Sequence, residues 1–125
     1  MHFTASQIHG TWQVVKAEFG GQPMPPEAAA QIQMEFTAGD YAVRFGGETT
    51  DAGSYVLSPA EPHHRITMTG RSGVNAGRTI PGIMHLVGDR LRLCCSMQGT
   101  APPAGFVSPA GAPQYLATYR RIRTP

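Results

Sequence analysis

The stretch IQMEFTAGDYAVRF, residues 32–45, decides the fold of this chain because it carries a clear period of two. In IQMEF the apolar side chains of Ile32, Met34 and Phe36 fall on one face, with polar side chains between them. AGD turns the chain, and YAVRF repeats the alternation. Successive side chains of a strand point to opposite faces, so this stretch predicts a hairpin with one apolar face.

The same alternation continues on both sides of this hairpin. We expect eight strands, in GTWQVVKAEF, IQMEF, YAVRF, GSYVL, HRITM, IPGIMHLV, RLRLCCSM and QYLATYRRI. The doublet Val14-Val15 predicts a bulge in the first strand, and a short helix is expected after Pro26, between the first two strands. Eight one-faced strands joined mostly by tight turns fit an antiparallel up-and-down barrel or a two-sheet sandwich, and the sequential hairpins favour the all-β barrel.

Length and charge limit the classes of function. The chain has 125 residues and a net charge of +2, which predicts one domain over residues 1–125 and no nucleic-acid partner. The basic cluster Arg120, Arg121 and Arg123 is interpreted as a solvated strand end. No stretch is long and apolar enough to span a membrane, so a soluble, cytoplasmic protein is expected, with a secreted form lacking its signal as the alternative.

Two cysteines, Cys94 and Cys95, are neighbours in the sequence. In a strand they point to opposite faces, and a disulfide between neighbours would be strained. We therefore expect two free thiols and a reducing compartment.

Five segments in order carry a resemblance to a known family. They are GTWQVVKAEFGGQPMP, MEFTAGDYAVRFGG, GSYVLSPAEPHHRITMTG, NAGRTIPGIMHLVGDRLRLCC and FVSPAGAPQYLATYRR, from about Gly10 to Arg121. The chain thus resembles a planctomycete-rich bacterial family of uncharacterised lipocalin-like domains. This resemblance implies a calycin-type barrel and supplies no activity. One departure is that Pro102-Pro103 precede Phe106 where the family tends to carry an Arg-Pro pair.

The resemblance also implies how one end of the barrel is closed. In lipocalin-like barrels a Gly-x-Trp opens the first strand, and a basic residue from the last strand crosses the indole ring. The matching residues here are Gly10 and Trp12, with Arg120 or Arg121 as the basic residue. A guanidinium over an indole contributes about 0.5 to 2 kcal/mol. The alternative is that Trp12 is an ordinary core residue and both arginines are solvated.

The interior of an eight-stranded barrel is either filled by side chains or holds one small ligand. We expect a cavity that binds a small hydrophobic molecule. The expected lining residues are Met34, Phe36, Tyr41, Phe45, Tyr55, Ile66, Met68, Met84, Leu93 and Met97. Leu116 is also expected to point inward. Two alternatives stay open: a cofactor-independent cyclase or isomerase that uses the same cavity, and a protein-interaction module with a filled core.

No catalytic or metal-binding motif accompanies this pattern. His64 and Tyr55 are the candidate catalytic residues, as inward polar groups, and His64 and His85 are candidates to meet inside the barrel. The histidine spacing predicts no metal and no cofactor. Acidic residues, Asp51 among them, are expected mostly on turns or outward faces. Pro81 suits an edge strand or the first position of a strand better than a central position, and an exposed edge there leaves both a monomer and a homodimer open.

Overall fold

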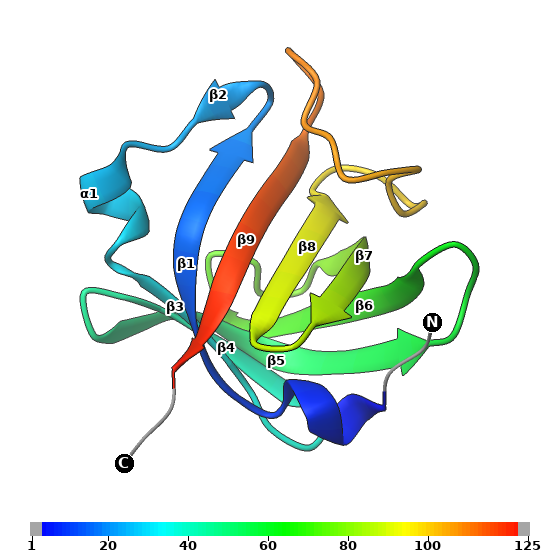
Figure 1. The fold of residues 1–125 in the computed structure, drawn as a ribbon, viewed down its shortest axis with the longest axis horizontal. Coiled ribbons are helices and arrows are strands. Elements are labelled where there is room, and N and C mark those ends of the chain that lie inside the picture. The colour runs from blue at the N-terminus through cyan, green and yellow to red at the C-terminus, as the bar shows by residue number, and fades with distance from the viewer. Residues whose placement is uncertain (1–3, 123–125) are drawn as a thin grey trace.

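The computed structural model describes residues 4–122, in which nine strands and two short helices follow one another along the chain (Figure 1). They are η1 (Ala5–Ile8), β1 (Gly10–Phe19), β2 (Gln22–Pro23), α1 (Pro26–Ala29), β3 (Ile32–Phe36), β4 (Asp40–Phe45), β5 (Glu48–Ser58), β6 (His64–Gly73), β7 (Thr79–Val87), β8 (Arg90–Ser96) and β9 (Gln114–Ile122). Each strand except β2 overlaps a predicted one, and α1 begins at Pro26 as expected. β5 begins five residues before the predicted strand, and β6 extends five residues beyond it. Arg123 lies outside the described residues.

Strand pairing closes the sheet into a barrel. Neighbours from β3 to β9 pair in sequence order, and β1 pairs with both β3 and β9, always antiparallel. Figure 1 shows β9 lying between β1 and β8, which joins the two ends of the sheet. The predicted eight-stranded, lipocalin-like barrel is therefore confirmed over the two-sheet sandwich, with β2 as a short flap on β1.

A tight glycine turn and a bulge in β1 follow directly from the local sequence. The turn between β4 and β5 consists of Gly46 and Gly47, whose φ angles of +60° and +90° suit glycine. The predicted bulge in β1 is present, because the register with β9 shifts between Val14 and Lys16.

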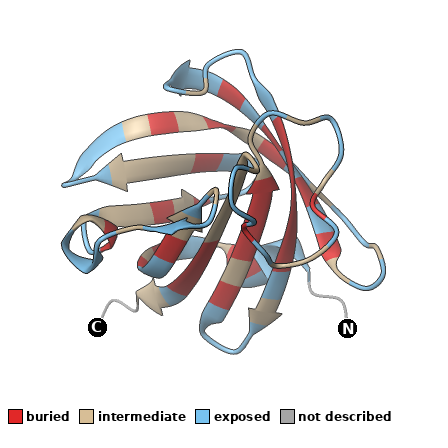
Figure 2. Ribbon diagram, turned by 90° about the horizontal axis from the view of Figure 1, so that it is seen from above, coloured by how far each residue is buried: buried red, intermediate tan, exposed pale blue. Residues whose placement is uncertain are grey.

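Side chains alternate between the barrel interior and solvent, and Figure 2 shows buried bands separated by exposed ones. In β6 the alternation is unbroken from His64 to Gly70. On β9 the buried residues are Ala117, Thr118 and Tyr119. The prediction that Leu116 points inward is wrong, since Ala117 and Tyr119 pair with the interior residues of β8 and Leu116 lines an outer groove.

The expectation that Pro81 lies on an edge strand or at the first position of its strand is also wrong. Pro81 is the third residue of β7, opposite Thr67 of β6. Pairing of β7 with β8 begins only at Gly82, so the missing N–H of Pro81 falls just outside that ladder. Because the barrel is closed, β7 has a neighbour on both sides.

Both cysteines are buried free thiols in β8 and lie on opposite faces of the strand. Cys95 lines the interior, whereas the Cys94 thiol donates to the Val107 carbonyl oxygen, 3.3 Å away, in the loop that covers the barrel wall. Among the described residues, no helix has the length and apolar character needed to span a membrane.

Candidate functional site

One end of the barrel is sealed by Trp12 and by the helix η1. The Trp12 side chain is fully buried, and its indole Nε1 donates to the Ile8 carbonyl oxygen at 2.9 Å. Ile8 is itself fully buried and belongs to the same core cluster as Trp12. Nothing in the alternating pattern predicted this contribution of Ile8, because η1 precedes the first strand.

Arg121, and not Arg120, lies over the indole of Trp12. The Arg121 Cζ is 4.3 Å from the ring centre, and its Nη1 donates to the His9 carbonyl oxygen at 2.9 Å. Its Nη2 donates to the Gln7 carbonyl oxygen, and its Nε lies 3.3 Å from Asp89 Oδ1. Arg120 is exposed. The sealed end therefore joins η1, β1 and β9.

The other half of the barrel interior holds a cavity of about 220 Å³. Its lining comes from seven strands, β3 to β9, and consists largely of the apolar residues Ile32, Met34, Val43, Met68, Ile80, Leu93 and Met97. The mouth of the cavity is formed by Thr50 near the start of β5 and by Val74 and Asn75 in the connection between β6 and β7. Val74 is 78% exposed there, so this end of the cavity reaches solvent.

The structure separates the predicted lining residues into three groups. Met34, Tyr41, Met68, Leu93 and Met97 line the cavity. Phe36, Tyr55, Ile66 and Met84 are buried in the core outside its lining. Phe45 differs from both groups because it is the last residue of β4 and its side chain is 48% exposed. It pairs with Ile32 at the rim of the barrel and does not line the cavity.

A polar cluster lies at the mouth and was missed by the sequence reasoning. Asp51 is only 6% exposed and lines the cavity, so the expectation of an outward or turn position is wrong for this residue. Its Oδ2 accepts a hydrogen bond from Asn75 Nδ2 at 2.8 Å. Tyr55 and Gly53 are inward positions of β5, and the next inward position toward the N-terminus is Asp51. Extending the alternation by two residues would have predicted that Asp51 points inward.

Three tyrosines add hydroxyl groups to the cavity lining. Burial raises the pKa of Tyr41 to about 12, with a further increase from the nearby Asp51 carboxylate. Burial also raises the pKa values of Tyr115 and Tyr119, whose hydroxyl oxygens are 3.5 Å apart. All three side chains are therefore neutral at physiological pH and offer hydroxyl groups, not charges, to a ligand.

The candidate catalytic residues His64 and Tyr55 do not line the cavity. The Tyr55 hydroxyl donates to the Thr37 carbonyl oxygen at 2.7 Å, and its ring packs edge-on against Phe36. His64 is buried on β6 opposite Met84. A catalytic role for either residue stays a prediction.

The histidines that approach each other are His63 and His85, and they do so outside the barrel. Their ring centres are 6.2 Å apart, and His63 also packs against Phe106 at 4.6 Å. His64 and His85, the candidates to meet inside the barrel, do not meet there, because His64 is buried while His85 is on the exposed face of β7. Among the described residues, no group of three potential ligands forms a metal site.

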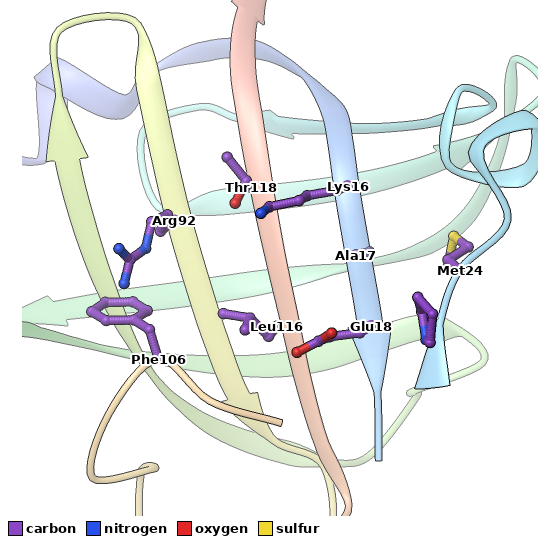
Figure 3. A pocket seen from close by; sticks show the side chains of 9 residues that line it. Lys16, Ala17, Glu18, Met24, Arg92, Phe106, Leu116 and Thr118 are labelled. Carbon is purple, nitrogen blue, oxygen red and sulfur yellow. The ribbon is translucent and has the colours of Figure 1, made fainter. Parts of the chain in front are cut away.

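A second hollow, of about 350 Å³, lies on the outer wall along β1, β9 and β8 (Figure 3). Lys16 and Glu18 extend across it, and Arg92 covers the ring of Phe106 with its Cζ 4.3 Å from the ring centre. Its charges have mixed sign and lie near solvent. The interior cavity is therefore the better candidate for a selective site.

No family model matches this chain, and neither a curated protein nor a solved structure matches it significantly. The fold and the cavity therefore carry the functional argument.

Proposed function

We propose that this protein binds a small hydrophobic molecule inside the barrel, and that it is related to the lipocalin-like family it resembles. The observation that carries the proposal is the apolar cavity of about 220 Å³ that reaches solvent on one side of a sealed barrel. Removing an apolar ligand from water is favourable by about 25 cal/mol per Å² of surface buried. A cavity lined by Met34, Met68 and Leu93 provides that burial.

The size of the cavity limits the ligand. Drug-sized ligands occupy pockets of roughly 300 to 1,000 Å³. At about 30 Å³ per water in the liquid, a volume of 220 Å³ equals roughly seven waters. The expected ligand is accordingly a molecule with a single ring or a short alkyl chain. The three methionines of the lining, which are flexible, let the cavity adapt its shape to such a molecule.

The test uses toluene as the apolar probe, titrated into the protein and followed by calorimetry and by backbone amide NMR shifts. We expect saturable binding, with shifts concentrated at Met68, Leu93 and other residues of the lining. The variant Val43→Trp fills the cavity from β4 and should abolish binding. Where this variant does not fold, Thr50→Trp at the mouth takes its place.

The matched control is Val56→Trp, which places the same side chain on the outer wall, where Val56 is 64% exposed. It should bind toluene as the parent does. If toluene leaves the amide shifts of the parent protein unchanged at saturating concentration, the proposal is refuted. Equal loss of binding in Val43→Trp and Val56→Trp would place the toluene site elsewhere and refute it as well.

A further inference from the structure

Two buried polar atoms of the cavity have no hydrogen-bond partner among the described residues. They are the hydroxyl of Tyr41 and Oδ1 of Asp51. Their side chains are 3% and 6% exposed, and both line the cavity. Asp51 pairs with Val43 on β4, two residues from Tyr41, so the two side chains lie on the same face of neighbouring strands.

The surroundings of Asp51 fix one of its oxygens and leave the other available. Asn75 donates to Oδ2, and Arg78 in turn donates to the Asn75 amide oxygen at 3.2 Å, which orients the amide. Arg71 is engaged with Asp40 on the outside, with 3.2 Å between Nη2 and Oδ1. Asp51 lines the cavity, and its Oδ1 is a buried acceptor that has no donor within residues 4–122.

Buried carboxylate oxygens are costly unless a donor satisfies them. A ligand that supplies a donor gains a charge-assisted hydrogen bond, whereas a carboxylate ligand meets like charge at the same point. The neutral Tyr41 hydroxyl complements the donor, because it accepts from an ammonium or donates to an alcohol oxygen. Asp51 is hydrogen-bonded to Asn75 at the mouth, and apolar side chains such as Leu93 line the same cavity.

We propose that the ligand of this cavity is a small amphiphile with an apolar body and one hydrogen-bond donor head, an amine or an alcohol, that donates to Asp51 Oδ1 beside Tyr41. The head lies at the mouth, and the apolar body extends toward Met34 and Leu93. A carboxylate of the same length is rejected. This inference rests on the proposed binding function and adds the chemistry of the head group.

The experiment compares hexylamine, hexan-1-ol and hexanoate, which share one alkyl chain, by calorimetry and amide NMR at pH 7. We expect the amine and the alcohol each to bind at least ten-fold more tightly than hexanoate. Asp51→Asn should reduce that preference at least ten-fold for the amine. Tyr41→Phe should weaken hexan-1-ol and leave toluene unchanged.

Asp40→Asn is the matched control, since it removes the same charge on the outer face, where the Asp40 side chain is 54% exposed. It should leave all three affinities as in the parent. Circular dichroism checks that each variant folds, and Asp51→Ser replaces Asp51→Asn where the latter does not.

The toluene titration separates the two proposals. Toluene binding together with equal affinities for the three hexyl probes would overturn the donor-head inference and leave the cavity function standing. An unchanged preference in Asp51→Asn would also overturn the donor-head inference and leave the cavity function standing. It would mean that Asp51 Oδ1 binds water and not the head of the ligand. Failure of toluene and of every hexyl probe would refute both proposals.

Discussion

The guanidinium carbon of Arg121 lies 4.3 Å from the centre of the Trp12 ring, across the seam where β1 pairs with β9. The same guanidinium donates to two backbone carbonyl oxygens of the segment that leads into β1. Its side chain is only 19% exposed, so these contacts are partly shielded from water. Arg121 therefore fastens the sealed end of the barrel, and the opposite end is left for the ligand.

Replacement of Arg121 by alanine should lower the free energy of unfolding by about 2 to 3 kcal/mol, because it removes a cation–π contact and charged hydrogen bonds to the Gln7 and His9 carbonyl oxygens. Urea unfolding measures the change. Arg121→Lys should lose nearly as much stability as Arg121→Ala, because a lysine ammonium lacks the planar, forked donor geometry of the guanidinium. The control Arg120→Ala should change stability by less than about 0.5 kcal/mol, and an equal cost at both positions would contradict the assignment.

Replacement of Trp12 by alanine should cost about 3 to 5 kcal/mol, because it opens a large void under η1 and removes the hydrogen bond to Ile8. Urea unfolding followed by circular dichroism measures this, since the variant has no tryptophan fluorescence. A cost below about 1 kcal/mol would show that the indole does not support the sealed end.

Gly10 begins β1 with a φ of +125°, a backbone conformation that side chains with a Cβ rarely adopt. We expect Gly10→Ala to cost about 1 to 3 kcal/mol in the same unfolding assay. A Cβ at this position would lie 3.5 Å from Arg121 Nη1, so the cost comes from backbone strain more than from a clash. Gly105→Ala, at a glycine without a positive φ or a close neighbour, should cause no loss.

Stability should fall at alkaline pH because the cavity tyrosines are held neutral. Burial raises the pKa of Tyr41 from 10.0 to about 12, so between these values the folded protein binds a proton that the unfolded chain has released. The contribution is complete below pH 10 and is lost as pH rises toward 12. Each such tyrosine contributes a slope of up to about 1.4 kcal/mol per pH unit. Urea unfolding at pH 9, 10 and 11 should show this decline.

Tyr41→Phe is the matched variant for the alkaline decline. Its unfolding free energy should fall less steeply with pH than that of the parent, because one buried titrating group is gone. Parallel curves for the two proteins would assign the whole decline to other groups, such as Tyr115 and Tyr119, and would contradict a raised pKa at Tyr41.

The strand pattern was predictable because burial of one sheet face leaves a period of two in the sequence. The prediction of inward side chains failed where inward and outward positions of a strand are both apolar, and where an inward position carries a polar residue. On β9 Tyr115 and Leu116 are adjacent, and only the register with β8 decides that Tyr115 lines the cavity. On β5 the inward phase continues through Gly53 to Asp51, and an acidic side chain there resembles a turn residue.

Contacts between distant segments were beyond the reach of the pattern. Ile8 joins the core beside Trp12, whose indole donates to the Ile8 carbonyl oxygen. Asn75 reaches Asp51 across 24 positions of sequence, from a connection that the sequence indicates only as a glycine-rich loop. The choice of Arg121 over Arg120 likewise depends on the phase of β9 at its last residues.

The two thiols of β8 should differ in how they become accessible. Burial raises the pKa of Cys94 and that of Cys95, so both should resist iodoacetamide at pH 8 in the folded protein. Cys94 is covered by the loop at Val107, whereas Cys95 faces the barrel interior. Opening the loop is a smaller event than opening the barrel, so Cys94 should be alkylated before Cys95. Mass spectrometry of timed samples measures the order, with the urea-unfolded chain as the control in which both react at similar rates. Alkylation of Cys95 first would mean that the barrel wall opens more readily than the loop over it.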